Sequence, residues 1–274
     1  MPKILIIIPA FNEEDSIEET LLQLNNQTNK NFEVTVVNNA STDSTQAIVE
    51  KLISRVSYPL SVLFEEKPGP GSARKKAADD ALRRDTSILA GTDADCDIDP
   101  HWIECIVASL KNPLIHAVAG KQIFSIRRLK KITALTQNKT EKKLIELFSL
   151  HNFIVAHTLR KPLLTGTNFG IKSDVYTHTG GFVQLYHKGA PTSGTDWDLG
   201  RKLYELGYHT SFTQTENPQD PRRLLWRLTT DRDSLYDKVF NNVRPQDFTE
   251  RLSGVSDERM LFHLSRMLTF QMLS

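Results

Sequence analysis

Short apolar runs alternate with helix-like stretches through the first half of the chain. The runs at 4–8, 34–37, 61–64 and 87–90 have the length and apolar content of strands that are buried on both faces. The segments between them place apolar residues three and four positions apart, which is the spacing of a helix with one buried face. Strands that alternate with helices in this way predict a largely parallel sheet covered by helices, an α/β fold.

In the second half the alternation is less regular, and the predicted elements are fewer. We expect a strand over 117–126 and a basic, helix-compatible segment over 127–143. Residues 183–195 contain two glycines and a proline, so we expect a mobile loop there. A helix is expected over 199–206, ending at Gly207.

The last sixty or so residues are charged and helical in pattern, with Leu261, Leu264 and Leu268 on one face. A chain of 274 residues is long enough for one large α/β domain with a smaller appendage. We therefore expect a main domain over 1–214 and a helical C-terminal extension over 215–274.

The composition excludes several classes of protein. With 39% hydrophobic and 24% charged residues the chain is typical of globular proteins. A formal net charge of +1 argues against a dedicated nucleic-acid binder. Its two cysteines, Cys96 and Cys105, cannot form a disulfide framework and fit a reducing compartment. The apolar run at 147–159 is broken by polar residues, so it does not predict a membrane span, and we expect a cytoplasmic protein.

Polar clusters follow three of the predicted strands, at 9–14, 38–43 and 93–97. An open α/β sheet binds its ligand at the carboxyl ends of its strands, so these clusters mark a candidate site. Asp93 and Asp95 can face one divalent cation, because Mg²⁺ or Mn²⁺ combines one or two carboxylates with phosphate oxygens. Such a metal would stabilise the charge on a departing nucleoside diphosphate. The alternative is an Asp-rich loop that only solvates a turn and caps the next helix.

The motifs, taken in order, resemble glycosyltransferase family 2, whose members have the GT-A fold. The resemblance covers residues 4 to about 210, and the order and spacing of the motifs make it specific. The segments that carry it are Pro9-Ala10-Phe11-Asn12-Glu13-Glu14, Asn38-Asn39-Ala40-Ser41-Thr42-Asp43, Gly69-Pro70-Gly71-Ser72-Ala73-Arg74, Asp93-Ala94-Asp95, Gly166-Thr167-Asn168-Phe169-Gly170-Ile171, Gly180-Gly181-Phe182 and Asp196-Trp197-Asp198-Leu199.

The resemblance implies a Rossmann-like mixed sheet flanked by helices. It implies a nucleotide-sugar-binding half over 1–112 and an acceptor and catalytic half over 113–214. The implied reaction moves a sugar from a nucleotide-diphosphate-sugar donor to an acceptor hydroxyl, with inversion at the anomeric carbon. The acceptor would be a glycan, a lipid-linked molecule or a small molecule.

The resemblance also implies roles for matched residues. Asp95 would be the main metal ligand, for Mg²⁺ or Mn²⁺, with Asp93 beside it, and Asp196 would be the general base. For Asp196 the structural alternative is a helix N-cap, and both roles can coexist. The implied nucleotide-sugar-binding positions are Pro9, Ala10, Asn12, Glu14, Asn39, Arg74, Asp93 and Ala94, and the acceptor-side positions are Asn168 and Gly181.

The chain departs from the family where Asn38 and Asn39 replace paired acids. An Asn oxygen still accepts a hydrogen bond from a base but carries no charge, so the base preference stays open. These two residues also keep open a catalytically degenerate binding module, against which Asp93, Asp95 and Asp196 argue.

Three other enzyme classes fit less well. An Asp-dependent phosphohydrolase would need Thr or Val where Asp97 stands. A dinucleotide-binding oxidoreductase would need a Gly-x-Gly-x-x-Gly motif after the first strand, and the chain has none there. A nucleotidyltransferase would need a Gly- and Arg-rich loop in the same place.

The basic run at 127–143 is typical of a solvated face. Together with the apolar stripe of the C-terminal segment, it also fits peripheral contact with anionic lipid at the inner face of a membrane.

Overall fold

The computed structural model describes residues 2–134, 138–187, 189–192, 194–229, 256 and 258. The expected helical face at Leu261, Leu264 and Leu268 lies outside these residues. Backbone contacts divide the chain into two compact units. The first unit comprises 1–122 and 161–217, and the second comprises 123–160 and 218–274.

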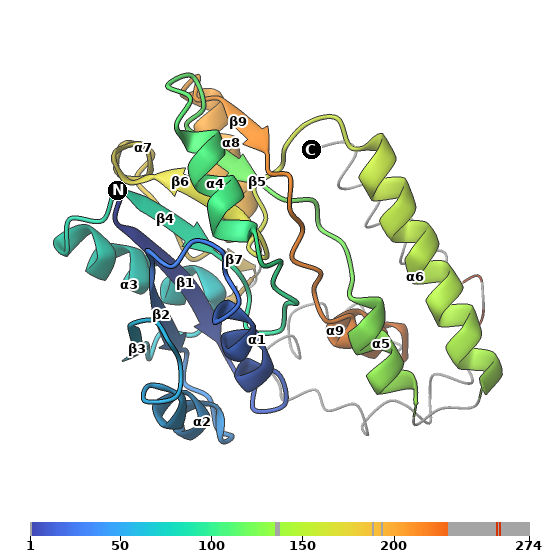
Figure 1. The fold of residues 1–274 in the computed structure, drawn as a ribbon. Coiled ribbons are helices and arrows are strands. Elements are labelled where there is room, and N and C mark those ends of the chain that lie inside the picture. Colours follow the sequence, from blue (N-terminus) through green and yellow to red (C-terminus); the bar gives the residue numbers. More distant parts are fainter. Residues whose placement is uncertain are drawn as a thin grey trace. The chain divides into compact units, whose positions relative to one another are not determined.

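A seven-stranded mixed sheet forms the centre of the first unit, in the order β3-β2-β1-β4-β6-β5-β9 (Figure 1). The strands β3, β2, β1 and β4 are parallel, and β6 runs antiparallel to its neighbours β4 and β5. The last strand, β9, is parallel to β5. The strands are β1 (Ile4–Ala10), β2 (Glu33–Asn38), β3 (Leu60–Phe64), β4 (Ile88–Gly91), β5 (Ala117–Ala119), β6 (Phe169–Lys172) and β9 (Thr210–Phe212).

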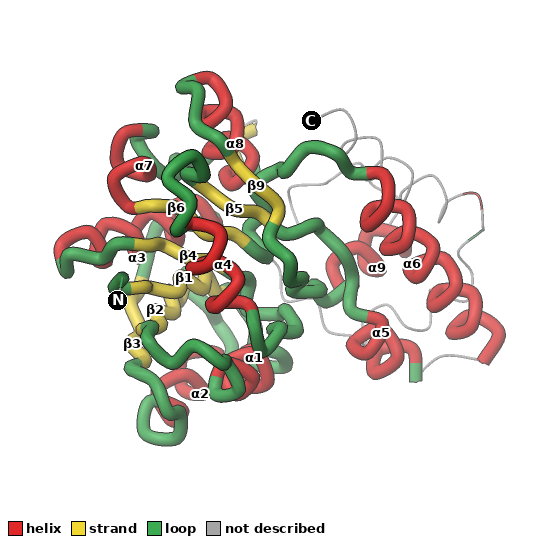
Figure 2. Tube along the Cα trace, turned by 45° about the horizontal axis from the view of Figure 1, so that its top comes forward, coloured by secondary structure: helices red, strands yellow, loops and turns green. Residues whose placement is uncertain are grey.

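Helices cover both faces of the sheet, because alternate residues of its inner strands point to opposite sides. Figure 2 shows these helices in red around the yellow strands. In β1, Ile4, Ile6 and Ile8 belong to the apolar core shared with α1, α2 and α4, whereas Leu5 and Ile7 belong to the core shared with α3, α7 and α8. The bounds are α1 (Ile17–Leu24), α2 (Thr45–Leu52), α3 (Pro70–Arg83), α4 (Trp102–Leu110), α7 (Ser173–His178) and α8 (Thr195–Glu205).

Helix α3 packs closely on β1 and β2 because the residues on its buried face are small. Ala73, Ala77, Ala78 and Ala81 are all fully buried there. Pro70 is the first residue of the helix, where a missing N–H removes no intrahelical hydrogen bond. The close packing brings the first turn of α3 to the sheet edge where β1 and β2 end.

The second unit is helical in the part that the structure describes, and Figure 2 shows its three helices side by side. Its core contains Phe124, Leu129, Phe148 and Leu225. The helices are α5 (Ile126–Thr133), α6 (Asn138–Thr158) and α9 (Arg222–Thr229). No helix among the described residues is both long enough and apolar enough to cross a membrane.

Three expected elements differ from the structure. The strand predicted over 117–126 ends at Ala119, and the next residue, Gly120, lies against the Asn168 side chain. Ser125 then caps α5, its hydroxyl accepting a hydrogen bond from the Arg128 N–H at 3.0 Å. The basic segment at 127–143 divides between α5 and α6, and the loop at 183–195 contains a hairpin, β7 (Tyr186–His187) and β8 (Ala190–Pro191).

Candidate active site

The three polar clusters predicted from the sequence meet at one edge of the sheet. β1 pairs in parallel with both β2 and β4, so their carboxyl ends lie side by side. The loops that leave β1, β2 and β4 carry the clusters at 9–14, 38–43 and 93–97.

The first two loops are joined by hydrogen bonds between their polar side chains and backbone. Asn12, with a positive φ of 52°, accepts a hydrogen bond from the Thr42 N–H at 2.8 Å. The Asp43 carboxylate accepts from the Glu14 N–H at 3.1 Å. The Glu14 carboxylate in turn accepts from the Ser44 N–H, just before α2, at 3.0 Å. Glu14 therefore holds the two loops together.

The side-chain amide of Asn39 forms hydrogen bonds with the backbone that follows β3. Its Nδ2 donates to the carbonyl oxygens of Glu65 and Lys67 at 3.0 and 2.7 Å, and its Oδ1 accepts from the Gly69 N–H at 2.7 Å. Only 4% of the residue is exposed. Asn39 thus fixes the loop that leads into α3, and both of its amide hydrogens are occupied.

Asn38 is also buried but faces the β2–α2 loop. Its Oδ1 accepts from the Ser41 N–H at 3.0 Å, and its Nδ2 donates to Gln46 at 2.7 Å. Neutral amides therefore make these contacts at the two positions where the family often has acids.

A buried ion pair joins α3 to the loop after β4. Arg74 Nη2 lies 2.6 Å from Asp93 Oδ1, with 6% and 18% of the two side chains exposed. Arg74 Nη1 is 3.4 Å from the hydroxyl of Thr195, the first residue of α8. A side chain at Gly166 would overlap the guanidinium group and displace it. Arg74 thus connects the two elements that carry Asp93 and Asp196.

Asp95 differs sharply from Asp93. It is 1% exposed, and among the described residues neither carboxylate oxygen has a hydrogen-bond partner. The Thr20 hydroxyl lies 2.8 and 3.0 Å from the carbonyl oxygens of Ala94 and Cys96, so the backbone on both sides is held. Burying a charged carboxylate without a partner is unfavourable unless a cation compensates it. The Asp95 site therefore fits a divalent cation.

Within the described parts of the chain, no three His, Cys, Asp or Glu side chains are grouped to hold a metal. Burial raises the pKa of the Cys96 thiol well above its usual value, and the charges of Asp95 and Asp93 add to this effect. The two carboxylates would bind a metal together with oxygens of a ligand.

Asp196 lies in the first turn of α8, and its side chain contacts a residue outside that helix. The N-cap is Gly194, with φ 95°, so the N-cap interpretation of Asp196 is wrong. The Asp196 Oδ2 accepts a hydrogen bond from the Gly166 N–H at 2.5 Å. The side chain is half-buried, and no ion pair involving it is found among the described residues.

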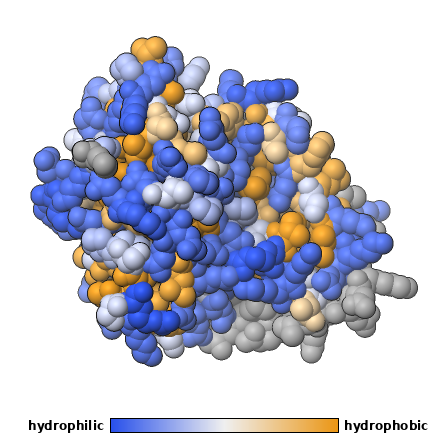
Figure 3. Space-filling model, in the orientation of Figure 1, coloured by the Kyte–Doolittle hydropathy of each residue, from blue (hydrophilic) through white to orange (hydrophobic). Residues whose placement is uncertain are grey.

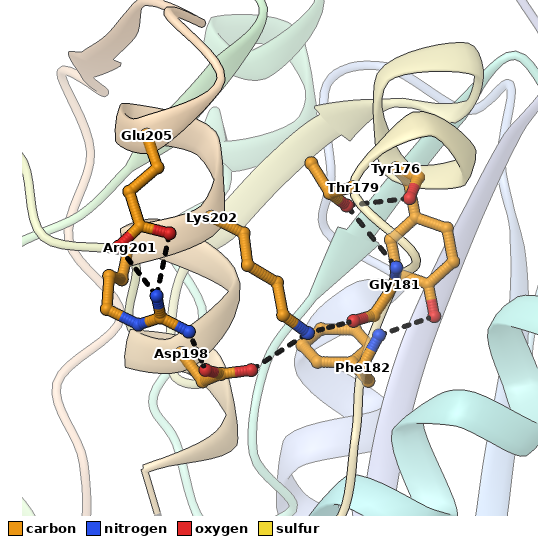
Figure 4. Close-up of polar contacts among 8 residues, drawn as sticks. All are labelled: Tyr176, Thr179, Gly181, Phe182, Asp198, Arg201, Lys202 and Glu205. Carbon is orange, nitrogen blue, oxygen red and sulfur yellow. Dashed lines mark hydrogen bonds and ion pairs between the residues drawn. The ribbon is translucent and has the colours of Figure 1, made fainter.

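Asp198, one turn from the start of α8, is held by two cations. Its carboxylate lies 2.8 Å from Arg201 and 2.9 Å from Lys202 (Figure 4). Burial alone would raise the pKa of Asp198, but the hydrogen bonds from Lys202 and Arg201 outweigh it and lower the pKa. Asp198 is consequently a poorer proton acceptor than a carboxylate held by one backbone N–H.

The same network fixes the Gly180-Gly181-Phe182 segment. Lys202 reaches from α8 to the Gly181 carbonyl at 3.2 Å, as Figure 4 shows. Gly181 has φ 67°, and a side chain there would overlap the Tyr176 ring. The Tyr176 hydroxyl accepts from the Phe182 N–H at 3.0 Å.

Asn168 is completely buried and ties three elements together. Its Oδ1 accepts from the Trp102 indole N–H at 2.8 Å, and its Nδ2 donates to the Thr215 carbonyl at 2.9 Å. The segment before β6, which includes Gly166, is thereby fixed against α4 and the chain after β9.

Sequence reasoning missed several residues that shape the site. Thr20, Thr195 and Gln184 all contact motif residues, but each is an ordinary polar residue in its local pattern. Away from these motif contacts, burial raises the pKa of Glu216 to about 7, against the hydrogen bond from the Lys121 N–H and the Lys121 charge. Only long-range contacts reveal these roles.

Comparison with known proteins identifies the family. The model for Glycosyl transferase family 2 matches residues 5–176. The chain belongs to this family. Its curated relatives include the glycosyltransferase AglE of Haloferax volcanii, 25% identical over 214 residues, which are 77% of this chain and 64% of AglE. Another is the poly(ribitol-phosphate) β-N-acetylglucosaminyltransferase TarS of Staphylococcus aureus, 32% identical over 126 residues, or 40% of this chain and 21% of TarS.

Solved structures agree on the fold. The mannosyltransferase PcManGT of Pyrobaculum calidifontis, in complex with GDP-Man and Mn²⁺, gives a TM-score of 0.55 at 19% identity, covering 98% of this chain and 74% of PcManGT. TarS residues 1–349 with UDP-GlcNAc gives 0.54 at 21% identity, covering 78% and 57%. The expected GT-A fold and the assignment as a glycosyltransferase of family 2 type are confirmed.

The contacts of Asn39 lead to a stability prediction. Asn39→Asp would replace two donated hydrogen bonds by a carboxylate facing the carbonyl oxygens of Glu65 and Lys67. Leaving buried polar groups unsatisfied costs roughly 1–3 kcal/mol each, so the variant should unfold at least about 2 kcal/mol more easily in urea. Asn26→Asp, at an exposed position, adds the same charge and should match the wild type. Equal unfolding midpoints for all three proteins would show that the Asn39 amide does not hold this loop.

Proposed function

We propose that this glycosyltransferase transfers a sugar from a nucleoside-diphosphate donor to an acceptor hydroxyl, with Mg²⁺ or Mn²⁺ held by Asp95 and Asp93. The observation that carries the proposal is the buried Asp95 carboxylate without a hydrogen-bond partner. PcManGT was solved with a nucleotide sugar and Mn²⁺, which supports the same combination here. When bound, the metal would stabilise the negative charge on the departing diphosphate.

Under this proposal the nucleoside lies against the loops after β1 and β2. Pro9, Ala10 and Asn12 face it, while Glu14 and Asn39 hold the shape of these loops through the contacts described above. Arg74 and Ala94 fix the carboxylates under the diphosphate: Arg74 through its ion pair with Asp93, and Ala94 through the Thr20 hydroxyl.

The catalytic step we propose is one displacement. The acceptor oxygen bonds to the anomeric carbon while the bond from that carbon to the diphosphate oxygen breaks. The acceptor proton passes to Asp196, and the anomeric configuration inverts. Gly166 orients the Asp196 carboxylate through Oδ2, so Oδ1 can receive the proton.

The next prediction tests whether Asp95 binds a metal, and distinguishes this from its effect on the stability of the fold. Without metal, Asp95→Asn should raise the melting temperature, because it removes an uncompensated buried charge. The same variant should lose most of the extra stability that Mn²⁺ with UDP or GDP gives the wild type. Thermal unfolding with and without Mn²⁺ and each nucleotide measures both effects.

Asp15→Asn is the matched control, since Asp15 is exposed and the substitution removes the same charge. It should respond to metal and nucleotide as the wild type does. Calorimetry that finds equal nucleotide affinity with Mn²⁺ and with a chelator would exclude the metal site.

A further prediction tests whether Asp196 is the general base. Asp196→Asn keeps the acceptor oxygen for Gly166 but cannot take a proton. Turnover should fall by about two to four orders of magnitude, while nucleotide affinity is retained. Single-turnover transfer with a donor–acceptor pair, found by screening UDP- and GDP-sugars, measures it.

Asp198→Asn provides the comparison, because it removes the neighbouring carboxylate on the same helix. It should cost much less turnover than Asp196→Asn. The reverse order of effects would make Asp198 the base, and wild-type turnover in both variants would show that neither carboxylate is the general base.

We also propose that α6 contacts an anionic lipid surface. Leu150 and Phe153, 53% and 60% exposed, lie one turn apart on this helix. Exposed Lys142 and Arg160 flank them toward its two ends, which matches an anionic surface. On the face shown in Figure 3, hydrophobic and hydrophilic residues mix in the region of α6.

This proposal predicts salt-sensitive binding to vesicles. The wild type should co-sediment with phosphatidylglycerol-containing vesicles at low ionic strength and less at high salt. Replacing Leu150 and Phe153 together by Ser should abolish this, whereas Leu114→Ser, at a residue 70% exposed in the first unit, should not. No co-sedimentation of the wild type would leave α6 with a solvated face.

A further inference from the structure

One side chain outside the family motifs joins the hairpin of β7 and β8 to the first turn of α3. Gln184 Oε1 accepts hydrogen bonds from the N–H groups of Gly71 and Ser72 at 2.9 and 3.3 Å. The N–H groups of a first helical turn have no partner within their own helix. A residue more than a hundred positions away therefore satisfies two of them.

The other end of the same amide closes the base of the hairpin. Gln184 Nε2 donates to the carbonyl oxygens of Leu185 and Thr192 at 2.7 and 3.0 Å. Thr192 also donates its own N–H to the Leu185 carbonyl at 2.8 Å. Both the oxygen and the nitrogen of Gln184 are thus needed, one for α3 and one for the hairpin.

The Gly-Pro-Gly sequence before and within α3 makes room for this contact. A side chain at Gly69 would overlap the Gln184 amide. A side chain at Gly71 would overlap Thr195 and the Val183 carbonyl. The hairpin segment and α8 therefore pack directly against the start of α3.

The same turn of α3 leads to the candidate active site. Arg74 follows Gly71 by three residues, pairs with Asp93 and approaches Thr195, the neighbour of Asp196. A shift of the first turn of α3 would move this guanidinium group and with it the carboxylate of Asp93.

We propose that Gln184 is a positioning residue that couples the donor site to the hairpin of β7 and β8. Through α3 and Arg74, the state of the donor site determines how firmly the hairpin base is held. This inference rests on the proposed donor site, since the coupling needs a nucleotide bound near Asp93.

The test measures amide hydrogen exchange of the full chain, and NMR reads the exchange rate of each residue. The wild type is compared with and without Mn²⁺ and either UDP or GDP. We expect the nucleotide to slow exchange of the Thr192 amide several-fold, because a fixed Arg74 holds the first turn of α3 and the Gln184 amide bound to it.

Two substitutions separate the two ends of the amide. Gln184→Glu keeps an oxygen that can accept from the Gly71 N–H. Its second oxygen replaces the Nε2 donor and would repel the carbonyl oxygens of Leu185 and Thr192. Its Gly71 amide should stay protected, while its Thr192 amide exchanges fast whether or not nucleotide is bound. Gln184→Ala should expose both amides.

Gln214→Glu, at an exposed position, is the control for the added charge and should behave as the wild type. A Thr192 amide that is equally protected in Gln184→Glu and the wild type would overturn the proposal. So would a wild type that binds nucleotide with no change at Thr192. If neither nucleotide binds, the proposed donor site fails instead, and the exchange rates without ligand still show whether Gln184 holds α3 and the hairpin.

Discussion

The ion pair of Arg74 and Asp93 is the interaction on which the geometry of the candidate site depends. It joins α3 to the loop after β4, and the same guanidinium group approaches Thr195 at the start of α8. Removing one partner from such a buried pair is unfavourable, because the other charge stays in a poorly solvated place. The pair also distinguishes the two carboxylates chemically: Asp93 is paired with a cation, whereas Asp95 has no such partner in the part of the chain that the structure describes.

The loops around this pair are ordered by hydrogen bonds among themselves. Glu14 and Asp43 each accept from the backbone of the other's loop, and Asn39 holds the chain between β3 and α3. In each of these contacts a side chain meets the backbone of another loop, so hydrogen bonds to the backbone set the shape of this edge of the sheet.

The two aspartates at the start of α8 show how contacts distinguish identical residue types. Asp198 is neutralised by Arg201 and Lys202, and Lys202 also connects α8 to Gly181. Asp196, two positions earlier, faces the Gly166 N–H. Asp198 is therefore paired within its own helix, whereas Asp196 contacts a separate segment of the chain.

The sequence alone determined the α/β class, most of the strands and helices of the first half, and the family. Apolar runs such as Ile4–Ile8 and the alanine face of α3 report burial directly, because a strand buried on both faces is apolar throughout and a helix buried on one face repeats its apolar residues every three or four positions. The strand order, the early end of β5 and the hairpin at 186–191 came only from the tertiary structure. So did the contrast between Asp93 and Asp95 and the role of Gln184. These features depend on contacts between residues far apart in the sequence, which no local pattern records.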